Sequence, residues 1–403
     1  MRHFLPQHLH ISQNITIFAA DLQLKNNEDY VNNANDILFI MFIHERNKWT
    51  LFYWNAAEVN PLLDTVCREI GKLYGRLGML GMPSQALIEA ENIVEDVVRS
   101  SEIEGVLLNM EEVRSSVTRN LGIDTLLNNE KTPSRMVDAV VNVMMTAMAH
   151  YQQAIDKQVL CGWHSGLFET GFSGGIPITV GQYRQCAEQI VSGAFGHEKI
   201  HYVAPAPERV PEEMEGFIRW FNTPSADSQI IRSAIAHLWF VSIHPFEDGN
   251  GRISRLLAEI CLARGDNSSA RYYSIAAAIN TDKKNYYRCL ETVQRGSGDI
   301  TAWLVWYIHT LQEAVRISDN RITTILQKTL FWQRHEGVSL SERQQTTINR
   351  LLQEDKTRVM SRTWAHLSKC SSDTALRDLN DLVQKGVMSI EDPHAKRFTY
   401  LFL

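Results

Sequence analysis

Apolar residues recur at helical spacing over most of the chain. The pattern is clearest between Trp54 and Leu77, where leucine, valine and isoleucine return every three or four residues before a glycine-rich stop. A second run starts near Ser84 and ends at Gly105, which can adopt a left-handed helix cap. Further helices are predicted over residues 110–121, 133–158 and much of 212–318. The pattern therefore predicts a mainly α-helical protein.

Three parts of the chain depart from this pattern. Residues 1–50 show no sustained period and are left unassigned, as an N-terminal extension. Residues 171–181 form a glycine-rich loop. Shortly afterwards, the apolar stretches Gln189–Ser192 and Lys199–Val203 flank the sequence Gly-Ala-Phe-Gly, which predicts a β-hairpin.

A different order of elements is predicted near the C-terminus. Short helices are expected at residues 344–352 and 363–368, and a third from Ser371 or Ser372 to Gly386. Two alternating segments follow, 387–390 and 397–403, joined across Asp392 and Pro393. Three helices followed by a β-hairpin predict a winged helix within residues 319–403.

Composition limits the functional classes. At about 150 residues per domain, 403 residues suggest two or three domains, and 44% hydrophobic with 21% charged residues excludes a disordered chain. Forty Lys and Arg against 46 Asp and Glu give a net charge of −6, which argues against a polyanion binder over the whole chain. Six scattered cysteines without a C-x-x-C pair predict free thiols rather than a zinc site. With no signal-like start and no apolar run near 20 residues, we expect a cytoplasmic protein without membrane contact.

One segment carries chemistry. Residues 244–255 read His-Pro-Phe-Glu-Asp-Gly-Asn-Gly-Arg-Ile-Ser-Arg and lead into an apolar helix. Gly249 and Gly251 let backbone amides approach a ligand, and the helix start adds its positive dipole end. Arg252 and Arg255 lie three residues apart, so both can reach phosphate oxygens from one face of the helix. The segment predicts a polyphosphate site.

Two further residues complete the predicted site. Asp248 is a hard oxygen ligand suited to Mg²⁺ that bridges phosphates, and His244 can act as a general base near neutral pH. A calcium loop is excluded because Arg252 falls at a ligand position and no glutamate stands at the twelfth place. The chain also lacks the P-loop and Rossmann glycine patterns. The combination predicts phosphoryl or nucleotidyl transfer.

His244–Arg255 resembles the signature of the Fic family, H-P-F-x-D-G-N-G-R-x-x-R, at every fixed position. The resemblance implies a helical core at residues 131–318 that transfers AMP from ATP to a Ser, Thr or Tyr hydroxyl of a target protein. It implies that His244 is the base, that Asp248 holds Mg²⁺ and that Phe246 anchors the loop. The residues it implies at the nucleotide are Gly249, Asn250, Gly251, Arg252, Ile253, Ser254, Arg255 and Tyr287.

The resemblance extends beyond the signature. The hairpin at 189–203 resembles the family's flap, which clamps a target segment by main-chain bonding. Asn285-Tyr286-Tyr287 resembles the stretch that closes the adenine pocket, with Tyr287 as the residue that stacks on the adenine or forms a hydrogen bond to it.

An inhibitory motif is also implied. Ser100-Ser-Glu-Ile-Glu-Gly105 resembles the family pattern [ST]-x-x-x-E-[GN], within a small helical domain at 51–130. The resemblance leads us to expect that Glu104 pairs with Arg252, so that this guanidinium cannot receive the γ-phosphate and ATP binds in an unproductive pose. The enzyme would be largely inactive at rest.

Alternatives stay open at this point. The same site could remove AMP from a modified target, with Glu104 positioning a water. The winged helix could bind DNA through Arg362, Lys369, Arg377 and Lys385, although the flanking residues Asp373, Asp378 and Asp381 oppose this. Self-modification and a homodimer are further open alternatives.

Overall fold

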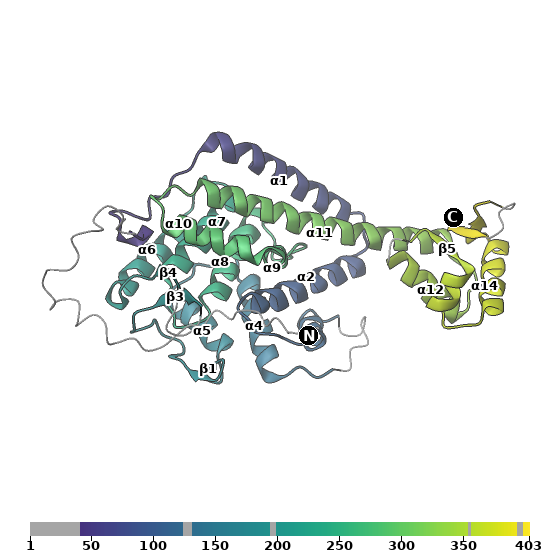
Figure 1. Cartoon of the computed structure of the whole chain (residues 1–403), viewed down its shortest axis with the longest axis horizontal. Coiled ribbons are helices and arrows are strands. Elements are labelled where there is room, and N and C mark those ends of the chain that lie inside the picture. Colours follow the sequence, from purple (N-terminus) through teal and green to yellow (C-terminus); the bar gives the residue numbers. More distant parts are fainter. Residues whose placement is uncertain (1–40, 124–130, 194–198, 354–355, 393–397) are drawn as a thin grey trace, which may run out of the picture. The chain divides into compact units, whose positions relative to one another are not determined.

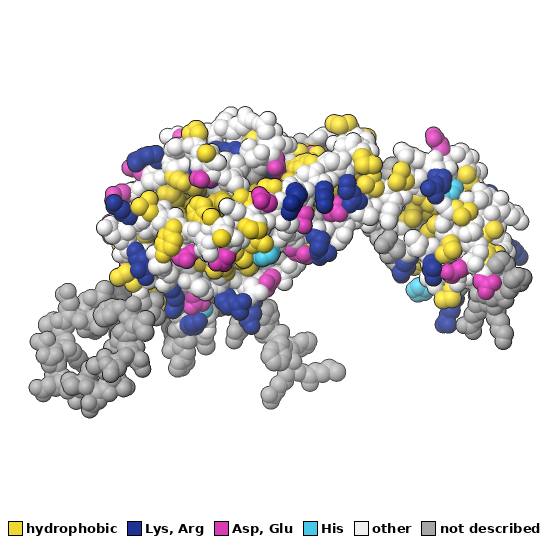
Figure 2. All heavy atoms as spheres, turned by 90° about the horizontal axis from the view of Figure 1, so that it is seen from above, with side chains coloured by type: hydrophobic (Ala, Val, Ile, Leu, Met, Phe, Trp, Pro, Cys, Tyr) yellow, Lys and Arg dark blue, Asp and Glu magenta, His cyan; other side chains and the backbone are white. Residues whose placement is uncertain are grey.

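The computed structural model describes residues 41–123, 131–193, 199–353, 356–392 and 398–403 (Figure 1). The described residues form two compact units. The larger consists of residues 41–70 and 86–315, and the smaller of residues 71–85 and 316–403. On the face seen in Figure 2, side chains of both charge signs are interspersed with apolar ones.

Two helices form the centre of the larger unit. α7 (Gln229–Ile243) and α8 (Asn250–Asp266) pack against each other, and every residue of α7 from Ile230 to Ile243 is buried. A helix that is covered on all sides needs an apolar surface all round, as the run Ile-Ala-His-Leu-Trp-Phe-Val provides. Around this pair lie α4 (Arg135–Ala149), α5 (Lys157–Leu167), α6 (Val210–Asn222), α9 (Ile275–Thr281) and α10 (Lys283–Gln294).

A valine-rich core joins three helices ahead of this centre. α2 (Met82–Ile103), α3 (Met110–Asn120) and α4 bury Val94, Val113 and Val141 completely, together with neighbouring aliphatic side chains. The helices at residues 84–105 and 110–121 are therefore present as the sequence predicts. The mainly helical fold is confirmed.

One predicted helix is wrong. The pattern over residues 133–158 was expected to form a single helix, but α4 ends at Ala149 and α5 begins at Lys157. The Asp156 side chain accepts a hydrogen bond from the Val159 amide at 2.8 Å and caps the new helix. An N-cap aspartate starts a helix because it satisfies an amide that has no partner inside it.

Two small hairpins belong to the larger unit. β1 (Phe172–Ser173) pairs with β2 (Ile176–Pro177) in the glycine-rich loop. β3 (Gln189–Ser192) pairs antiparallel with β4 (Lys199–Val203), as predicted, but residues 194–198 of its turn lie outside the described residues. The register shifts between Ile190 and Val191, which makes His201 the extra residue of a β-bulge.

The smaller unit has its own core. It contains α12 (Glu342–Gln353), β5 (Arg358–Met360), α13 (Ser361–Leu367), α14 (Ser372–Gln384), β6 (Met388–Ile390) and β7 (Thr399–Phe402). The strands form one antiparallel sheet in the order β5-β7-β6, and Tyr400 of β7 is fully buried in one core with Trp364 and Leu379 of the helices. The three helices and the final strand pair follow the predicted order, whereas β5 was not predicted. Residues 393–397 of the connection between β6 and β7 lie outside the described residues.

Three remaining expectations concern the whole chain. Residues 1–40 lie outside the described residues, so most of the unassigned N-terminal segment has no structural account. All six cysteines are described and are free thiols. None of the helices in the described part combines the length and the apolar character needed to span a bilayer.

Candidate functional site

The chain turns sharply between α7 and α8. His244 ends α7 with φ 53° and ψ 60°, a left-handed conformation that is unusual for a residue with a side chain. Gly249, directly before α8, has φ 80°. The side chain of Asn250, the first residue of α8, accepts from the Phe246 amide at 3.0 Å and donates to the Phe246 carbonyl at 2.8 Å. Phe246 itself is fully buried. The loop is therefore locked against its own helix.

Arg184 fixes the strained end of α7. Its Nε donates to the His244 carbonyl at 2.7 Å, its Nη1 to Cys186 O at 2.7 Å and its Nη2 to Pro205 O at 2.6 Å. Its own amide donates to Pro245 O at 2.9 Å. The left-handed backbone conformation of His244 costs free energy. The hydrogen bonds that the buried Arg184 guanidinium donates to several carbonyls offset this cost and hold the backbone in place. Sequence reasoning missed Arg184, because a single arginine in a loop has no pattern.

The His244 ring is set up to accept a proton. Its Nδ1 lies 3.1 Å from the Val241 carbonyl, which makes Nδ1 the donor and leaves the Nε2 lone pair free. Burial lowers the pKa of His244 to about 4, and the charge of Arg184 acts in the same direction. The imidazole is therefore neutral at physiological pH, as a general base must be.

This pKa leads to a pH prediction. A base with the ordinary imidazole pKa of 6.5 would lose about tenfold in rate between pH 7.5 and pH 5.5 as it becomes protonated. Because the pKa of His244 is lowered to about 4, we expect its contribution to stay constant over that range. Initial rates of nucleotide transfer at constant ionic strength would measure it. A tenfold fall with a midpoint near 6.5 would contradict the lowered pKa.

The start of α8 offers donors to an anion. The first amides of a helix, here those of Asn250, Gly251 and Arg252, have no partner inside the helix. There is no room for a side chain at this point. A Cβ built on Gly251 would lie 1.9 Å from Glu104 Oε1, and one built on Gly249 would lie 2.7 Å from the Phe168 ring. The glycines let a carboxylate or phosphate oxygen approach the backbone.

Two residues predicted at the nucleotide, Ile253 and Ser254, have their polar groups bonded within α8. Ile253 is fully buried, and its amide already donates to Gly249 O at 3.0 Å. The Ser254 hydroxyl is also buried and donates to Gly251 O at 2.8 Å. The Ile253 amide and the Ser254 hydroxyl are thus already engaged within α8, and their contact with a nucleotide stays a prediction.

Glu104 directly follows the end of α2 and reaches the site, but not in the predicted way. Its Oε1 accepts a hydrogen bond from Arg255 Nη2 at 2.7 Å, and Arg255 also donates to the hydroxyl and carbonyl of Ser100, at 2.9 and 2.8 Å. The predicted pair of Glu104 with Arg252 is wrong. Arg255 bonds Ser100 and Glu104, whereas the Arg252 guanidinium lies 4.6 Å from the centre of the Phe168 ring.

The two arginines keep unused donors. Arg252 Nε and Arg255 Nη1 are buried, and neither has a hydrogen-bond partner among the residues that the structure describes. A buried donor without a partner costs about 1–3 kcal/mol, which an incoming anion would recover. The guanidinium groups therefore fit a phosphate-bearing ligand at the start of α8.

Asp248 is held at the mouth of the same loop. Its Oδ1 accepts from the Gly249 amide at 2.5 Å, and its Oδ2 accepts from the Ser173 hydroxyl on β1. A single carboxylate beside a phosphate cradle suits Mg²⁺, which is usually held by one or two carboxylates together with substrate phosphates. No cluster of three or more metal-ligating side chains occurs within the described ranges. Sequence reasoning missed Ser173, which β1 brings from far along the chain.

α10 holds the end of α2 in place. The Tyr287 hydroxyl donates to Ile103 O at 3.2 Å, and Lys283 Nζ donates to Glu102 O at 3.1 Å. These bonds satisfy carbonyls that the last turn of a helix leaves open. Gly105 follows with φ 80°, the left-handed cap that the sequence predicts. Tyr287 thus lies beside Glu104, and its contact with the adenine of a nucleotide stays a prediction.

Asp96 anchors α2 at a second point. It lies two turns before Glu104, is buried, and accepts hydrogen bonds from Ser274 Oγ at 2.7 Å and from the Ala276 amide at 3.4 Å. Burial raises the pKa of its carboxyl, against the opposing effect of these bonds. A cavity of ≈ 40 Å³, lined in part by Asp96, Ser100 and Arg255, lies between α2 and α8. Such a volume holds a water molecule.

Comparison with known proteins identifies the region. The model of the Fic/DOC family matches residues 154–262, which include the whole loop between α7 and α8. The chain carries a Fic domain. A second model, described as a domain of unknown function (DUF4172), matches residues 42–123, which include Glu104.

Relatives of the Fic domain are known from animals. The chain is 26% identical over 196 residues to a protein adenylyltransferase Fic of Drosophila ananassae, a match that covers 48% of this chain and 35% of the relative. It is 27% identical over 248 residues to the Drosophila persimilis protein of the same name, covering 60% and 44%. A protein adenylyltransferase fic-1 of Caenorhabditis briggsae is 28% identical over 218 residues, covering 52% and 40%. The matches thus span less than half of each relative.

A solved structure agrees with the fold. The crystal structure of a Fic family protein from Desulfovibrio desulfuricans superposes with a TM-score of 0.50 at 21% sequence identity. The superposition covers 85% of this chain and 96% of the other. At this identity, the likeness establishes a shared fold around the Fic domain and nothing finer.

Proposed function

We propose that this chain is a protein adenylyltransferase, which transfers AMP from ATP to a hydroxyl side chain of a target protein. The observation that carries the proposal is the pair of unsatisfied guanidinium donors, Arg252 Nε and Arg255 Nη1, in the motif whose first residue is the neutral His244. A phosphate cradle beside a base is the arrangement that nucleotidyl transfer needs. The relatives' names agree with this reaction.

The step assigned to His244 is a proton transfer. Its Nε2 accepts the proton of the target hydroxyl while the oxygen forms a bond to the α-phosphorus of ATP. The bond from that phosphorus to the oxygen bridging to the β-phosphate breaks, and pyrophosphate leaves. Arg252, Arg255 and the first amides of α8 hold the phosphates. Asp248 would hold Mg²⁺, which neutralises phosphate charge when bound.

Glu104 provides inhibition within the chain. Its carboxylate occupies the place beside Gly251 and Arg255 where a phosphate oxygen would otherwise bind. A charge-assisted hydrogen bond of this kind contributes about 1.5–3 kcal/mol, so ATP must displace it or bind in a different pose. The inhibitory partner is therefore Arg255, in place of the Arg252 expected from the sequence.

The β3–β4 hairpin offers a place for the target. It has only two strands, so each strand keeps one edge whose backbone groups can pair with an extended segment. A target segment bound as an added strand would bring its hydroxyl to the site without any requirement for a particular sequence.

Mass spectrometry provides the test. Incubation of the full chain with ATP, Mg²⁺ and a cell lysate should add AMP, and not phosphate, to hydroxyl side chains of lysate proteins. A mass shift of one phosphate would replace the proposal with a kinase reaction. A target first modified with AMP and then incubated without ATP tests the reverse reaction: its loss of AMP would identify the removal of AMP as the main activity.

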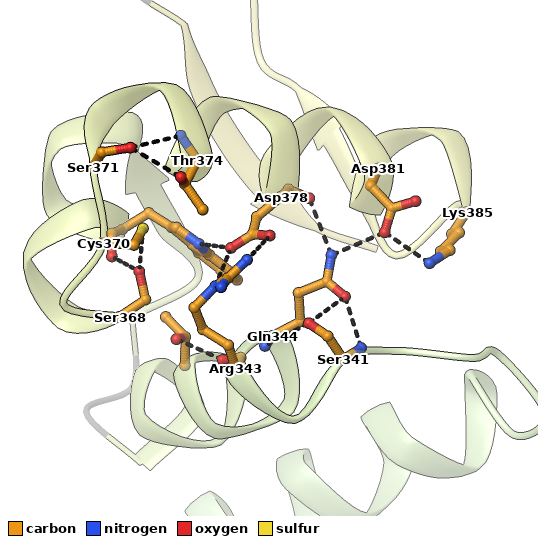
Figure 3. Close-up of polar contacts among 12 residues, drawn as sticks. Ser341, Arg343, Gln344, Ser368, Cys370, Ser371, Thr374, Asp378, Asp381 and Lys385 are labelled. Atoms are coloured by element: carbon orange, nitrogen blue, oxygen red, sulfur yellow. Dashed lines mark hydrogen bonds and ion pairs between the residues drawn. The ribbon is translucent and has the colours of Figure 1, made fainter.

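A second function is favoured by the smaller unit, which we propose to be a winged helix that binds duplex DNA. Two of the three acidic residues that opposed this hypothesis, Asp378 and Asp381, are engaged by partners within the unit (Figure 3). Asp378 is buried and accepts two hydrogen bonds from Arg343, both at 2.8 Å, and one from Trp364 at 3.2 Å. Asp381 pairs with Lys385 at 2.7 Å and accepts from Gln344 at 2.9 Å. These partners reduce the repulsion that Asp378 and Asp381 would exert on a phosphate backbone, whereas Asp373 is exposed at the start of α14.

The outward face of α14 has the composition of a DNA-reading helix. Its exposed residues follow helical spacing and are Ser372, Asp373, Leu376, Arg377, Asn380 and Gln384. Arginine and asparagine are the side chains that pair most specifically with guanine and adenine in the major groove. Arg362 on α13 and Lys369 in the turn between α13 and α14 are also exposed and can contact phosphates.

We expect the full chain to bind duplex DNA at low salt, with an affinity that falls linearly with salt on a logarithmic scale. Arg377→Ala should cost about 1–3 kcal/mol of binding. The matched control is Arg135→Ala, which removes a highly exposed arginine from the larger unit. Fluorescence anisotropy with a labelled duplex measures both. Absence of binding at about 50 mM salt, or an equal loss in the control, would refute DNA binding.

A further inference from the structure

A serine, a histidine and a glutamate outside the loop between α7 and α8 are joined by hydrogen bonds. Ser192 on β3 and His201 on β4 are neighbours across the hairpin, and Ser192 Oγ lies 2.5 Å from His201 Nε2. The other ring nitrogen, His201 Nδ1, lies 2.7 Å from Glu291 Oε2 on α10. A hydroxyl, an imidazole and a carboxylate connected through these atoms have the geometry of an activated serine.

The hydrogen-bond directions follow from the carboxylate. Glu291 can only accept, so His201 Nδ1 carries the proton and Nε2 is left to accept the Ser192 hydroxyl proton. Burial alone would raise the pKa of the Glu291 carboxyl, but the hydrogen bonds from His201 and Lys199 outweigh it and lower the pKa. Glu291 is therefore ionised and holds the imidazole in the tautomer that acts as a base.

The backbone is shaped to bring these side chains together. His201 is the extra residue of the bulge in β4, and its carbonyl accepts a hydrogen bond from Arg295 Nε at 3.2 Å. Bulges redirect a side chain and are frequent beside active sites. Ser192 and His201 are only partly buried, so a substrate can reach the hydroxyl.

The arrangement is connected to the candidate nucleotide site through α10. Glu291 follows Tyr287 by one turn of α10, about 6 Å along the helix axis, and Tyr287 touches the turn that carries Glu104. Lys199 and Arg295 both lie 3.3 Å from Glu291 Oε1 and make the surroundings of Ser192 positive. Such surroundings favour the approach of a polyphosphate over that of a neutral ester.

We propose that Ser192, His201 and Glu291 form a nucleophilic triad and that Ser192 is a site of self-modification, which accepts AMP from ATP. The inference rests on the proposed adenylyltransferase activity. In the step, Ser192 Oγ forms a bond to the α-phosphorus, the bond from that phosphorus to the bridging oxygen of the β-phosphate breaks and pyrophosphate leaves. The hydroxyl proton moves to His201 Nε2, and Glu291 stabilises the imidazolium that results.

Peptide mapping after incubation with ATP and Mg²⁺ tests the acceptor. In the full chain carrying Glu104→Gly, AMP should be found on Ser192. AMP at this position should be lost in Ser192→Ala. It should fall about 100-fold in His201→Gln, because glutamine can still donate to Glu291 but cannot act as a base. A smaller reduction is expected in Glu291→Gln. Ser225→Ala is the control, since this exposed serine bonds Asp227 and has no histidine partner.

A second measurement needs no ATP. A fluorophosphonate probe, which labels activated serines, should modify Ser192 with the same order of rates among these variants, whose thermal unfolding midpoints are compared in parallel. AMP on other residues but never on Ser192 would overturn the inference while leaving the adenylyltransferase proposal intact. Absence of AMP from every residue, together with probe labelling of Ser192 that depends on His201, would overturn the adenylyltransferase proposal and the acceptor role but support the triad. Absence of both would overturn the triad as well.

Discussion

Replacing Glu104 with glycine is expected to raise AMP incorporation about 10- to 100-fold. The range corresponds to the loss of a competing charge-assisted hydrogen bond worth about 1.5–3 kcal/mol. Without the carboxylate, Arg255 Nη2 and the space beside Gly251 become available to a phosphate oxygen. Labelled ATP with Mg²⁺, followed by quantification of label on protein, measures the change.

Glu102→Gly is the matched control for this variant. It places a glycine in the same helical turn, but the Glu102 side chain pairs with Arg99 at 2.7 Å and does not reach Arg255. The control should therefore leave incorporation low. Equal activation by both variants would mean that a weakened helix end, and not the removed carboxylate, releases the site. Unchanged incorporation in Glu104→Gly would remove the inhibitory role.

Replacing His244 with alanine in the Glu104→Gly chain is expected to reduce transfer by about 100- to 10,000-fold. General-base catalysis contributes rate factors of that size. ATP binding should change little, because the arginines and the first amides of α8 are left in place. Single-turnover assays measure transfer, and equilibrium dialysis with ATP measures binding.

His309→Ala controls for the loss of an imidazole as such. His309 is exposed on α11 (Thr301–Arg334) and bonds Gln312 at 2.9 Å, so its removal should leave transfer unchanged. Should His244→Ala abolish ATP binding as well, the left-handed turn that Arg184 holds would be the feature lost, since alanine adopts that conformation no more readily than histidine. A chain that keeps full transfer without His244 would need a different base.

Much of the fold could be predicted because local signals were strong. The helix that ends at Gly105, the hairpin of β3 and β4 and the helix capped by Ser371 all have a clear period and a stop residue. The prediction of a single helix over residues 133–158 failed, because the apolar period continues past a break that Asp156 imposes through one hydrogen bond. Strand β5 was missed because three residues carry too little periodicity, and its place depends on pairing with β7.

The candidate site shows the same division. The sequence by itself determined the loop chemistry, since His244, Asp248, the two glycines and both arginines stand in one short segment whose spacing on a helix is fixed at 3.6 residues per turn. Only the tertiary structure decided which arginine meets Glu104, because that depends on how α2 packs against α8. The tertiary structure also decided three contacts between distant segments: Arg184 with His244, Ser173 with Asp248, and His201 with Glu291. Contacts between distant segments depend on how whole helices pack, and a local pattern of residues carries no record of them.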